Sequence, residues 1–206
     1  MSRVVCDVTV SLDGFVAGPE QSLEHPLGRG GEDLHRWQFA EGDEHRRERD
    51  AIVAARAFIM GRNMFGPVRG PWPDASWTGW WGDDPPYHGP VFVLTHHERP
   101  DLPRDGGTTF HFATSGITDA LARARAAADG GDVAIAGGAA TIAQFLEDDL
   151  VDELRLHVAP VLLGSGERLL DGVTEFRLVP VSARATPLVT HLVYGREAAG
   201  VAESLG

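Results

Sequence analysis

The chain has 206 residues, of which 43% are hydrophobic and 23% charged, so it can bury the core of a single domain spanning residues 1–206. Its 18 basic and 30 acidic side chains give a formal net charge of −12, which argues against a nucleic acid or an anionic membrane as the main partner. An anionic small molecule stays compatible with this charge, because it needs only a local positive site.

The one cysteine, Cys6, excludes an internal disulfide framework and fits a reducing cytoplasm. It lies in the apolar run RVVCDVTVSL, which predicts a buried side chain without a catalytic role. The chain starts directly in this run, without the pattern of a signal peptide, and no apolar run approaches the roughly 20 residues of a membrane span. We therefore expect a cytoplasmic protein.

Apolar and β-branched runs predict strands, and runs with helical spacing predict helices between them. In chain order, strands are expected in RVVCDVTVSL (3–12), AFIMG (57–61), VFVLT (91–95), TTFHF (108–112), DVAIAGG (132–138), VDELRLHVAPVLLG (151–164), TEFRLVPVSARA (174–185) and PLVTHLVYGR (187–196). Helices are expected at 32–56, where Gly42 can divide the segment, at 116–131 and at 139–150. Apolar patches of the first helical segment are expected at Leu34, Trp37 and Phe39, and again at Ile52, Val53 and Ala55.

Strands that alternate with helices and then follow one another directly predict an α/β fold. We expect a mostly parallel central sheet with helices on both faces and antiparallel strands at its C-terminal end. The last ten residues are expected to form a loose tail. In such sheets ligands bind beyond the carboxyl ends of the strands.

Three turns at such strand ends suit phosphate groups. Gly137-Gly138-Ala139-Ala140-Thr141 joins a strand to a helix, and its glycines and helix N-terminus suit a pyrophosphate. A tight turn without a ligand is the alternative, and it is favoured for this turn taken alone. The sequence contains neither G-x-x-x-x-G-K-[ST] nor G-x-G-x-x-G, which argues against nucleoside triphosphate hydrolysis and leaves the standard dinucleotide fingerprint missing.

The other two turns carry basic side chains. Gly61-Arg62 follows a strand, where a guanidinium could hold a phosphate with two parallel hydrogen bonds; an ordinary surface arginine is the alternative. Thr95-His96-His97, with Arg99 after it, could receive a further phosphate such as the one on the ribose of NADP. A polar loop before Pro100 explains the same residues equally well.

The nine histidines form no H-E-x-x-H motif and no cysteine pair completes a zinc site, so no metal site is predicted. His111, His157 and His191 lie inside expected strands and are interpreted as structural, and His35 as a packed surface residue. The segment 66–90 is rich in Gly and Pro and holds four of the five tryptophans. A loop of this length favours a contact role, either an interface or a lid over a flat heteroaromatic substrate.

Five motifs in this order resemble one family: SLDGFVAG, IMGRNMFG, VFVLTHHERP, IAGGAATIAQFL and LVDELRLHVAPVLLGSGERLL. The family is the dihydrofolate reductase-like superfamily, in the group related to the C-terminal reductase domain of the bifunctional deaminase-reductase of riboflavin biosynthesis. The resemblance extends from about residue 3 to residue 195. It implies an NADPH-binding cleft and, through the segment 153–166, a homodimer.

The resemblance also implies roles for individual residues. Asp13 looks like the loop residue near the substrate or the nicotinamide ribose, and it is our candidate proton donor. The cofactor-binding residues that it implies are Gly61 and Arg62 at the phosphates, Thr95 and His96 near the adenosine and its 2′-phosphate, and Gly137, Gly138, Ala139, Ala140 and Thr141 at the pyrophosphate and nicotinamide side.

Several positions depart from the family pattern. Where the riboflavin reductases are expected to have a substrate-holding lysine and a glutamate, this chain has Asp7 and Ala136, which disfavours that pathway. Met64 stands where dihydrofolate reductases often have a threonine, and only Glu32 and Asp33 are near candidates for a pterin-binding carboxylate. We therefore predict an NADPH-dependent reductase of another small, planar heterocyclic or carbonyl substrate. An NADP(H)-binding or ligand-sequestering protein without turnover is the alternative.

Overall fold

The computed structural model describes residues 2–66, 70–72, 76–175 and 177–196. The expected C-terminal tail at 197–206 lies outside the described residues, as do 67–69 and 73–75 of the tryptophan-rich segment.

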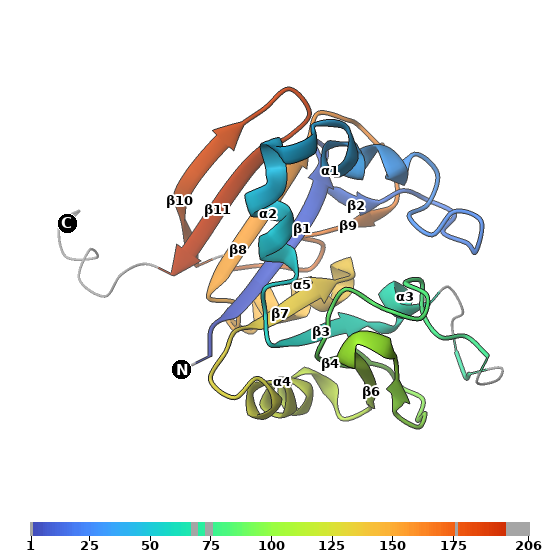
Figure 1. Ribbon diagram of the computed structural model, residues 1–206. Helices are drawn as coiled ribbons and strands as arrows, with labels where there is room; N and C mark the ends of the chain where they lie inside the picture. Colours follow the sequence, from blue (N-terminus) through green and yellow to red (C-terminus); the bar gives the residue numbers. More distant parts are fainter. Residues whose placement is uncertain (1, 67–69, 73–75, 176, 197–206) are drawn as a thin grey trace, which may run out of the picture.

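A nine-stranded sheet in the order β10-β11-β8-β1-β7-β3-β4-β6-β5 forms the centre of the molecule (Figure 1). Its strands are β1 (Val4–Ser11), β3 (Ala57–Gly61), β4 (Pro90–Leu94), β5 (Leu102–Pro103), β6 (Thr109–Ala113), β7 (Val133–Gly137), β8 (Glu153–Ala159), β10 (Leu178–Ala185) and β11 (Thr190–Arg196). The strands from β8 through β6 run parallel, whereas β11 is antiparallel to both β8 and β10. A separate pair joins β2 (Phe15–Ala17) to β9 (Glu167–Arg168). The predicted α/β sheet with antiparallel C-terminal strands is confirmed.

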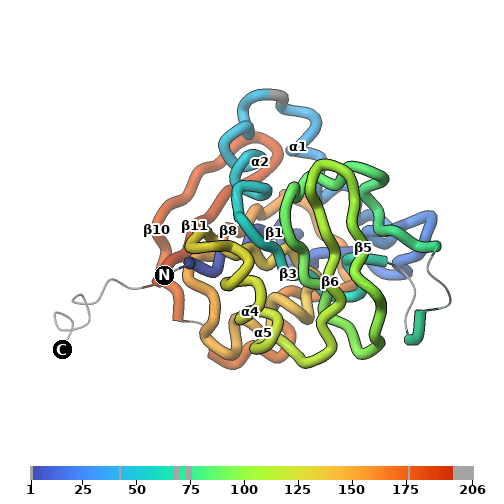
Figure 2. Tube along the Cα trace, turned by 60° about the horizontal axis from the view of Figure 1, so that its bottom comes forward, coloured from blue at the N-terminus to red at the C-terminus, as the bar shows by residue number. Residues whose placement is uncertain are grey.

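Helices cover both faces of this sheet, as expected (Figures 1 and 2). One face carries α4 (Gly116–Ala127) and α5 (Ala139–Glu147), and the other carries the segment that connects β2 to β3. That segment consists of η1 (Gly31–His35), α1 (Arg36–Ala40), η2 (Gly42–His45) and α2 (Arg46–Ile52). Two further short helices, α3 (Arg62–Phe65) and η3 (Asp105–Gly107), follow β3 and β5.

The sheet separates two hydrophobic cores. Side chains alternate along a strand, so Ile59 of β3 joins the core under α4 and α5, whereas Phe58 and Met60 join the core on the other face. Trp72 and Trp77 of the tryptophan-rich segment pack against this second core, as does Trp81. Together with Phe65 of α3, these tryptophans therefore cover this face of the sheet near β6, where Trp72 packs on Phe112 and Trp81 on Phe110.

The helical segment predicted at 32–56 is divided near Gly42, as the sequence allowed, and it is also divided at further positions. The structure has four short helical pieces there, and residues 53–56 are not helical. Leu34, Trp37 and His45 are fully buried. The rings of Trp37 and His45 lie 5.1 Å apart, whereas one straight helix would separate these two residues by about 12 Å along its axis. The predicted apolar patches are confirmed in part: Leu34 and Trp37 are buried, whereas Phe39 is 82% exposed and Val53 is 38% exposed.

Cys6 is fully buried in the core beneath α4 and α5, which confirms the predicted burial, and this burial raises the pKa of its thiol. Within the described part of the chain no helix is long and apolar enough to cross a membrane.

Candidate functional site at the strand ends

The carboxyl ends of β1, β7, β3 and β4 lie side by side, because these strands are parallel neighbours. The turn with Asp13 follows β1, the Gly137-Gly138 turn follows β7, Gly61-Arg62 follows β3 and Thr95-His96 follows β4. The turns that the sequence singled out therefore share one edge of the sheet, which is where open α/β sheets bind ligands.

Gly61 is the point at which the turn after β3 packs against the turn after β7. A Cβ atom at this position would lie 2.5 Å from Oγ1 of Thr141 and 3.5 Å from the backbone nitrogen of Gly138. Thr141 is itself buried, at 6% exposure. The turn after β3 thus packs directly on the first residues of α5, and only a residue without a side chain permits this approach.

Gly138 is the N-cap of α5, and its carbonyl accepts hydrogen bonds from the backbone of Thr141 and Ile142. A Cβ atom added to Gly138 would meet nothing within 4 Å, so the space beside this turn is open. The peptide bond between Gly137 and Gly138 is cis. An open space at a helix N-terminus, where N–H groups lack partners within the helix, suits an anion.

The guanidinium of Arg62 is the most unusual group at this edge. Its Nε, Nη1 and Nη2 atoms are all buried and have no hydrogen-bond partner among the described residues. Its Cζ atom lies 3.1 Å from the centre of the Trp72 ring. Burial lowers the pKa of Arg62 to about 10, and the positive charge of Arg99 contributes to this shift.

Arg99 brings a second positive charge to the same place. Its Cζ atom lies 4.8 Å from the Trp72 ring, and its Nη2 donates to the carbonyl of Trp77. Two cations beside one indole repel each other, and buried donors normally have acceptors. A phosphate would supply both the acceptors and the opposite charge, so the residues present fit a phosphorylated cofactor.

In the turn after β4, the Thr95 hydroxyl is engaged within the turn, and His96 is exposed. The Thr95 hydroxyl is 8% exposed and accepts a hydrogen bond from the backbone of His97, so it stabilises its own turn. His96 is exposed at the same strand end. The guanidinium of Arg99 packs on Trp72, whose Nε1 donates to the carbonyl of His97.

Asp13 holds two loops together. Its carboxylate accepts hydrogen bonds from the Ser11 hydroxyl at 2.6 Å and from the backbone N–H groups of Gly164 at 2.7 Å and Leu163 at 3.2 Å. The bond from Ser11 is the main cause that lowers the pKa of Asp13 to about 2, and the two backbone bonds add to it. A carboxylate with so low a pKa is ionised at neutral pH, which argues against the predicted role as proton donor.

We expect Asp13→Asn to remove an acid-sensitive part of the stability. An aspartate ordinarily titrates near pH 3.9, and Asp13 titrates at about 2 in the fold. Its carboxylate therefore stabilises the fold fully above about pH 4, and this contribution is lost as the pH falls toward 2. Urea unfolding between pH 4 and pH 2 should show a smaller loss of stability for Asp13→Asn than for the wild type. Asp50→Asn, at an exposed position of α2, is the control, and an unchanged slope for Asp13→Asn contradicts the prediction.

Two residues that depart from the family pattern, Asp7 and Met64, contact other groups of the protein. Asp7 accepts a hydrogen bond from Nε2 of His157 at 2.6 Å and lies 3.5 Å from Nη1 of Arg155. The sulfur of Met64 would lie 3.1 Å from a Cβ atom added to Gly137, so this methionine packs on the glycine turn. Asp7 is thus already engaged by protein groups.

Sequence reasoning missed Trp72. The guanidinium of Arg62 stacks on its indole ring, and its Nε1 donates to the carbonyl of His97. The ring also packs edge-on against Phe65 and Phe112. The tryptophan-rich composition marked the loop, but no local pattern identified which tryptophan would meet the arginine.

A model of the family described as RibD C-terminal domain matches residues 2–190. Among solved structures, the "putative riboflavin biosynthesis protein" of Shewanella sp. PV-4 has a TM-score of 0.65 and 22% identity, with 96% of this chain and 100% of that chain covered. A pyrimidine reductase-like protein of Corynebacterium diphtheriae has a TM-score of 0.58 and 15% identity, with 96% and 92% covered.

A third similar structure is a diaminohydroxyphosphoribosylaminopyrimidine deaminase/5-amino-6-(5-phosphoribosylamino)uracil reductase from Thermotoga maritima. It has a TM-score of 0.60 and 13% identity, and the match covers 95% of this chain and 57% of that one. No curated protein matches the chain. The likeness to these structures establishes the fold, and the family model covers almost all of the described residues. The chain belongs to the RibD C-terminal domain family and has its dihydrofolate reductase-like fold.

Proposed function

We propose that this protein is an NADPH-dependent reductase of a small, planar heterocyclic or carbonyl substrate. Membership of a reductase-domain family supports the reaction type. The observation that carries the choice of cofactor is the buried guanidinium of Arg62, which has no acceptor in the described part of the chain and lies next to Arg99.

The residues around Arg62 would bind the cofactor at two places. Arg62 and Arg99 would hold a phosphate against Trp72, and the Gly137-Gly138 turn would hold the pyrophosphate at the N-terminus of α5. Bound NADPH supplies a hydride to an electron-poor carbon. The protein would fix both reactants at the strand ends and exclude water from them.

We expect NADPH to bind more tightly than NADH by a factor of at least about 10, because the additional phosphate gives the guanidinium of Arg62 an anionic partner. Titration of the protein with each nucleotide, followed by tryptophan fluorescence, measures both affinities. Trp72 is a suitable reporter because it contacts Arg62. Binding of neither nucleotide would refute the proposal, and equal binding would refute the role of the arginines.

A binding protein without turnover is the second candidate. Asp7 favours it, because a carboxylate held by His157 and Arg155 cannot take the place of a lysine that binds substrate phosphate. The two candidates differ in one measurement: whether bound NADPH is oxidised when heteroaromatic and carbonyl compounds are offered. Family membership keeps the riboflavin-pathway reductase open, so its substrate belongs in the panel.

We also propose a cytoplasmic homodimer that forms through the late strands, as the resemblance implies. Sedimentation at several protein concentrations tests the assembly.

A further inference from the structure

Three histidines form a continuous file between two carboxylates. Nε2 of His157 lies 2.6 Å from Asp7, and Nδ1 of His157 lies 2.7 Å from Nδ1 of His191. Nε2 of His191 lies 2.9 Å from Nδ1 of His45, whose Nε2 lies 2.6 Å from Glu41. The file of His157, His191 and His45 thus joins β8, β11 and η2.

The histidine file is shielded from water. Its imidazoles belong to residues that are 2%, 4% and 0% exposed. The Trp37 ring packs on all three, with ring centres 4.9 to 5.1 Å apart. Each imidazole nitrogen therefore needs a partner within the protein.

The histidine file has fewer N–H groups than hydrogen-bond contacts. There are four contacts, and three neutral imidazoles offer three N–H groups, while ionised carboxylates offer none. The carboxylates of Asp7 and Glu41 each take an N–H, from His157 and His45. If His191 donates through Nδ1 to His157, the lone pairs of His45 Nδ1 and His191 Nε2 face each other. A cation between these two nitrogens would accept both lone pairs, so every imidazole nitrogen would have a partner.

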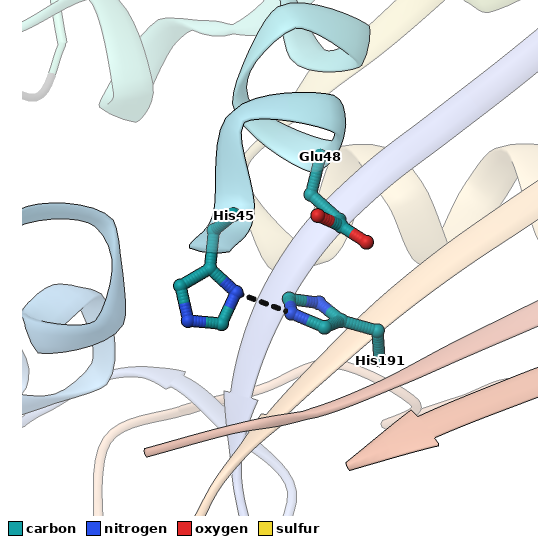
Figure 3. A group of neighbouring side chains, drawn as sticks. All are labelled: His45, Glu48 and His191. Carbon is teal, nitrogen blue, oxygen red and sulfur yellow. Dashed lines mark hydrogen bonds between the residues drawn. The ribbon is translucent and has the colours of Figure 1, made fainter. Parts of the chain in front are cut away.

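Glu48 lies at this junction. One ligand atom each from His45, Glu48 and His191 lies within 4.8 Å of the other two (Figure 3).

A positive group already occupies the approach to the junction. Nη2 of Arg184 lies 2.9 Å from Glu48 and 3.4 Å from Nδ1 of His45. The same guanidinium also binds Glu44 through Nη1 at 3.0 Å, and its side chain is 39% exposed. It can therefore release Glu48 and keep Glu44, which makes it a competitor that an ion can displace.

We propose that His45, Glu48 and His191 bind one Zn²⁺ ion, with water in the fourth position. Two imidazoles and a carboxylate are common zinc ligands, and bond lengths of about 2.0–2.2 Å set ligand atoms about 3.3–3.5 Å apart. Nδ1 of His45 and Nε2 of His191 now lie 2.9 Å apart, and the three ligand atoms all lie within 4.8 Å of one another, so small shifts of the side chains bring them to this spacing. The remaining ring nitrogens then donate to Glu41 and His157, which is the outer-shell arrangement that orients ligating histidines.

The ion would fasten the η2–α2 segment to the C-terminal edge of the sheet. His45 and His191 are 146 residues apart in the chain, so no spacing motif reveals the site. It also lies away from the glycine turns: β11 is three strands from β7, about 14 Å at the usual strand spacing. The role that follows is stabilisation of the fold, since an ion that binds only the folded chain raises its stability.

The test uses the tag-free protein, stripped with EDTA and transferred to chelator-free buffer. Calorimetric titration with Zn²⁺ should show one ion per chain, Co²⁺ should give the visible absorption of a tetrahedral site, and Zn²⁺ should raise the unfolding temperature. His191→Gln and Glu48→Gln should weaken Zn²⁺ binding at least about 10-fold, and Glu41→Gln about 10- to 100-fold. His25→Gln, at an imidazole that is 60% exposed, is the matched control and should change nothing.

Arg184→Gln gives the opposite sign, because it removes the competing cation and should tighten Zn²⁺ binding. Glu48 and Arg184 are both partly exposed, so their variants keep the test valid if His191→Gln does not fold. The proposal is overturned if the wild type takes up no stoichiometric Zn²⁺, if Glu48→Gln binds as the wild type does, or if Arg184→Gln does not bind more tightly.

Discussion

Arg62→Met is expected to weaken NADPH binding and, at the same time, to raise the unfolding temperature of the protein without cofactor. Methionine keeps apolar contact with Trp72 but removes a buried cation whose three nitrogens find no acceptor among the residues that the structure describes. Loss of hydrogen bonds between a guanidinium and a phosphate costs about 1.5–3 kcal/mol. The dissociation constant should therefore rise roughly 10- to 150-fold.

The gain in stability has a separate cause. A charge that is withdrawn from water and left without a partner destabilises a fold, so its replacement by an apolar group of similar length is stabilising. Arg123→Met is the matched control, because Arg123 also packs on an aromatic ring, that of Phe92, but lies on α4 away from the strand ends. Fluorescence titration and thermal unfolding give the two readouts. An NADPH affinity equal to that of the wild type rules out Arg62 as a phosphate ligand.

Gly61→Ala is expected to destabilise the fold by about 1–3 kcal/mol, the usual range for an extra carbon in a tightly packed site. The new Cβ atom would lie 2.5 Å from Oγ1 of Thr141, a buried side chain that holds the start of α5. For a chain of this length such a loss lowers the unfolding temperature by roughly 2–12 °C. It also displaces Arg62, so NADPH binding should weaken.

Thr141→Ala should rescue this variant, because it removes the atom that the new methyl group meets. The other atoms near the added Cβ lie 3.5 and 3.7 Å away, at ordinary contact distance. The double variant should therefore be more stable than Gly61→Ala alone, with a coupling of about 0.5–3 kcal/mol. Thermal unfolding of the wild type, both single variants and the double variant measures this coupling. Additive effects would show that the two residues do not meet.

The central strands could be predicted from the sequence because each is buried on both faces. AFIMG and VAIAG read as short apolar runs between breaks, and the structure places β3 and β7 on them. The segment 32–56 could not be predicted in the same way. Its helical pieces are only four to seven residues long, and the burial of Trp37 and His45 depends on strands more than a hundred residues away.

The candidate site was predictable in its positions and not in its contacts. Glycine pairs and a lone arginine at strand ends are visible in the sequence, and the parallel order of β7, β3 and β4 brings them to one edge. That Arg62 would be buried on Trp72 depends on the path of a loop, which no periodicity encodes. The backbone hydrogen bond that the Asp13 carboxylate accepts from Gly164 likewise joins residues 151 positions apart in the chain.

The hydrogen bonds of Asp13 restrict the movement of the loops on the β1 side of the candidate site. They tie the turn after β1 to the turn after β8, and the backbone of Leu12 adds a further bond to Val161. We therefore expect the turn after β1 and the turn after β8 to move together as one unit. Any widening of the site to admit a substrate must come from the opposite side, so the dimensions of the β1 side limit the shape of the molecules that can enter.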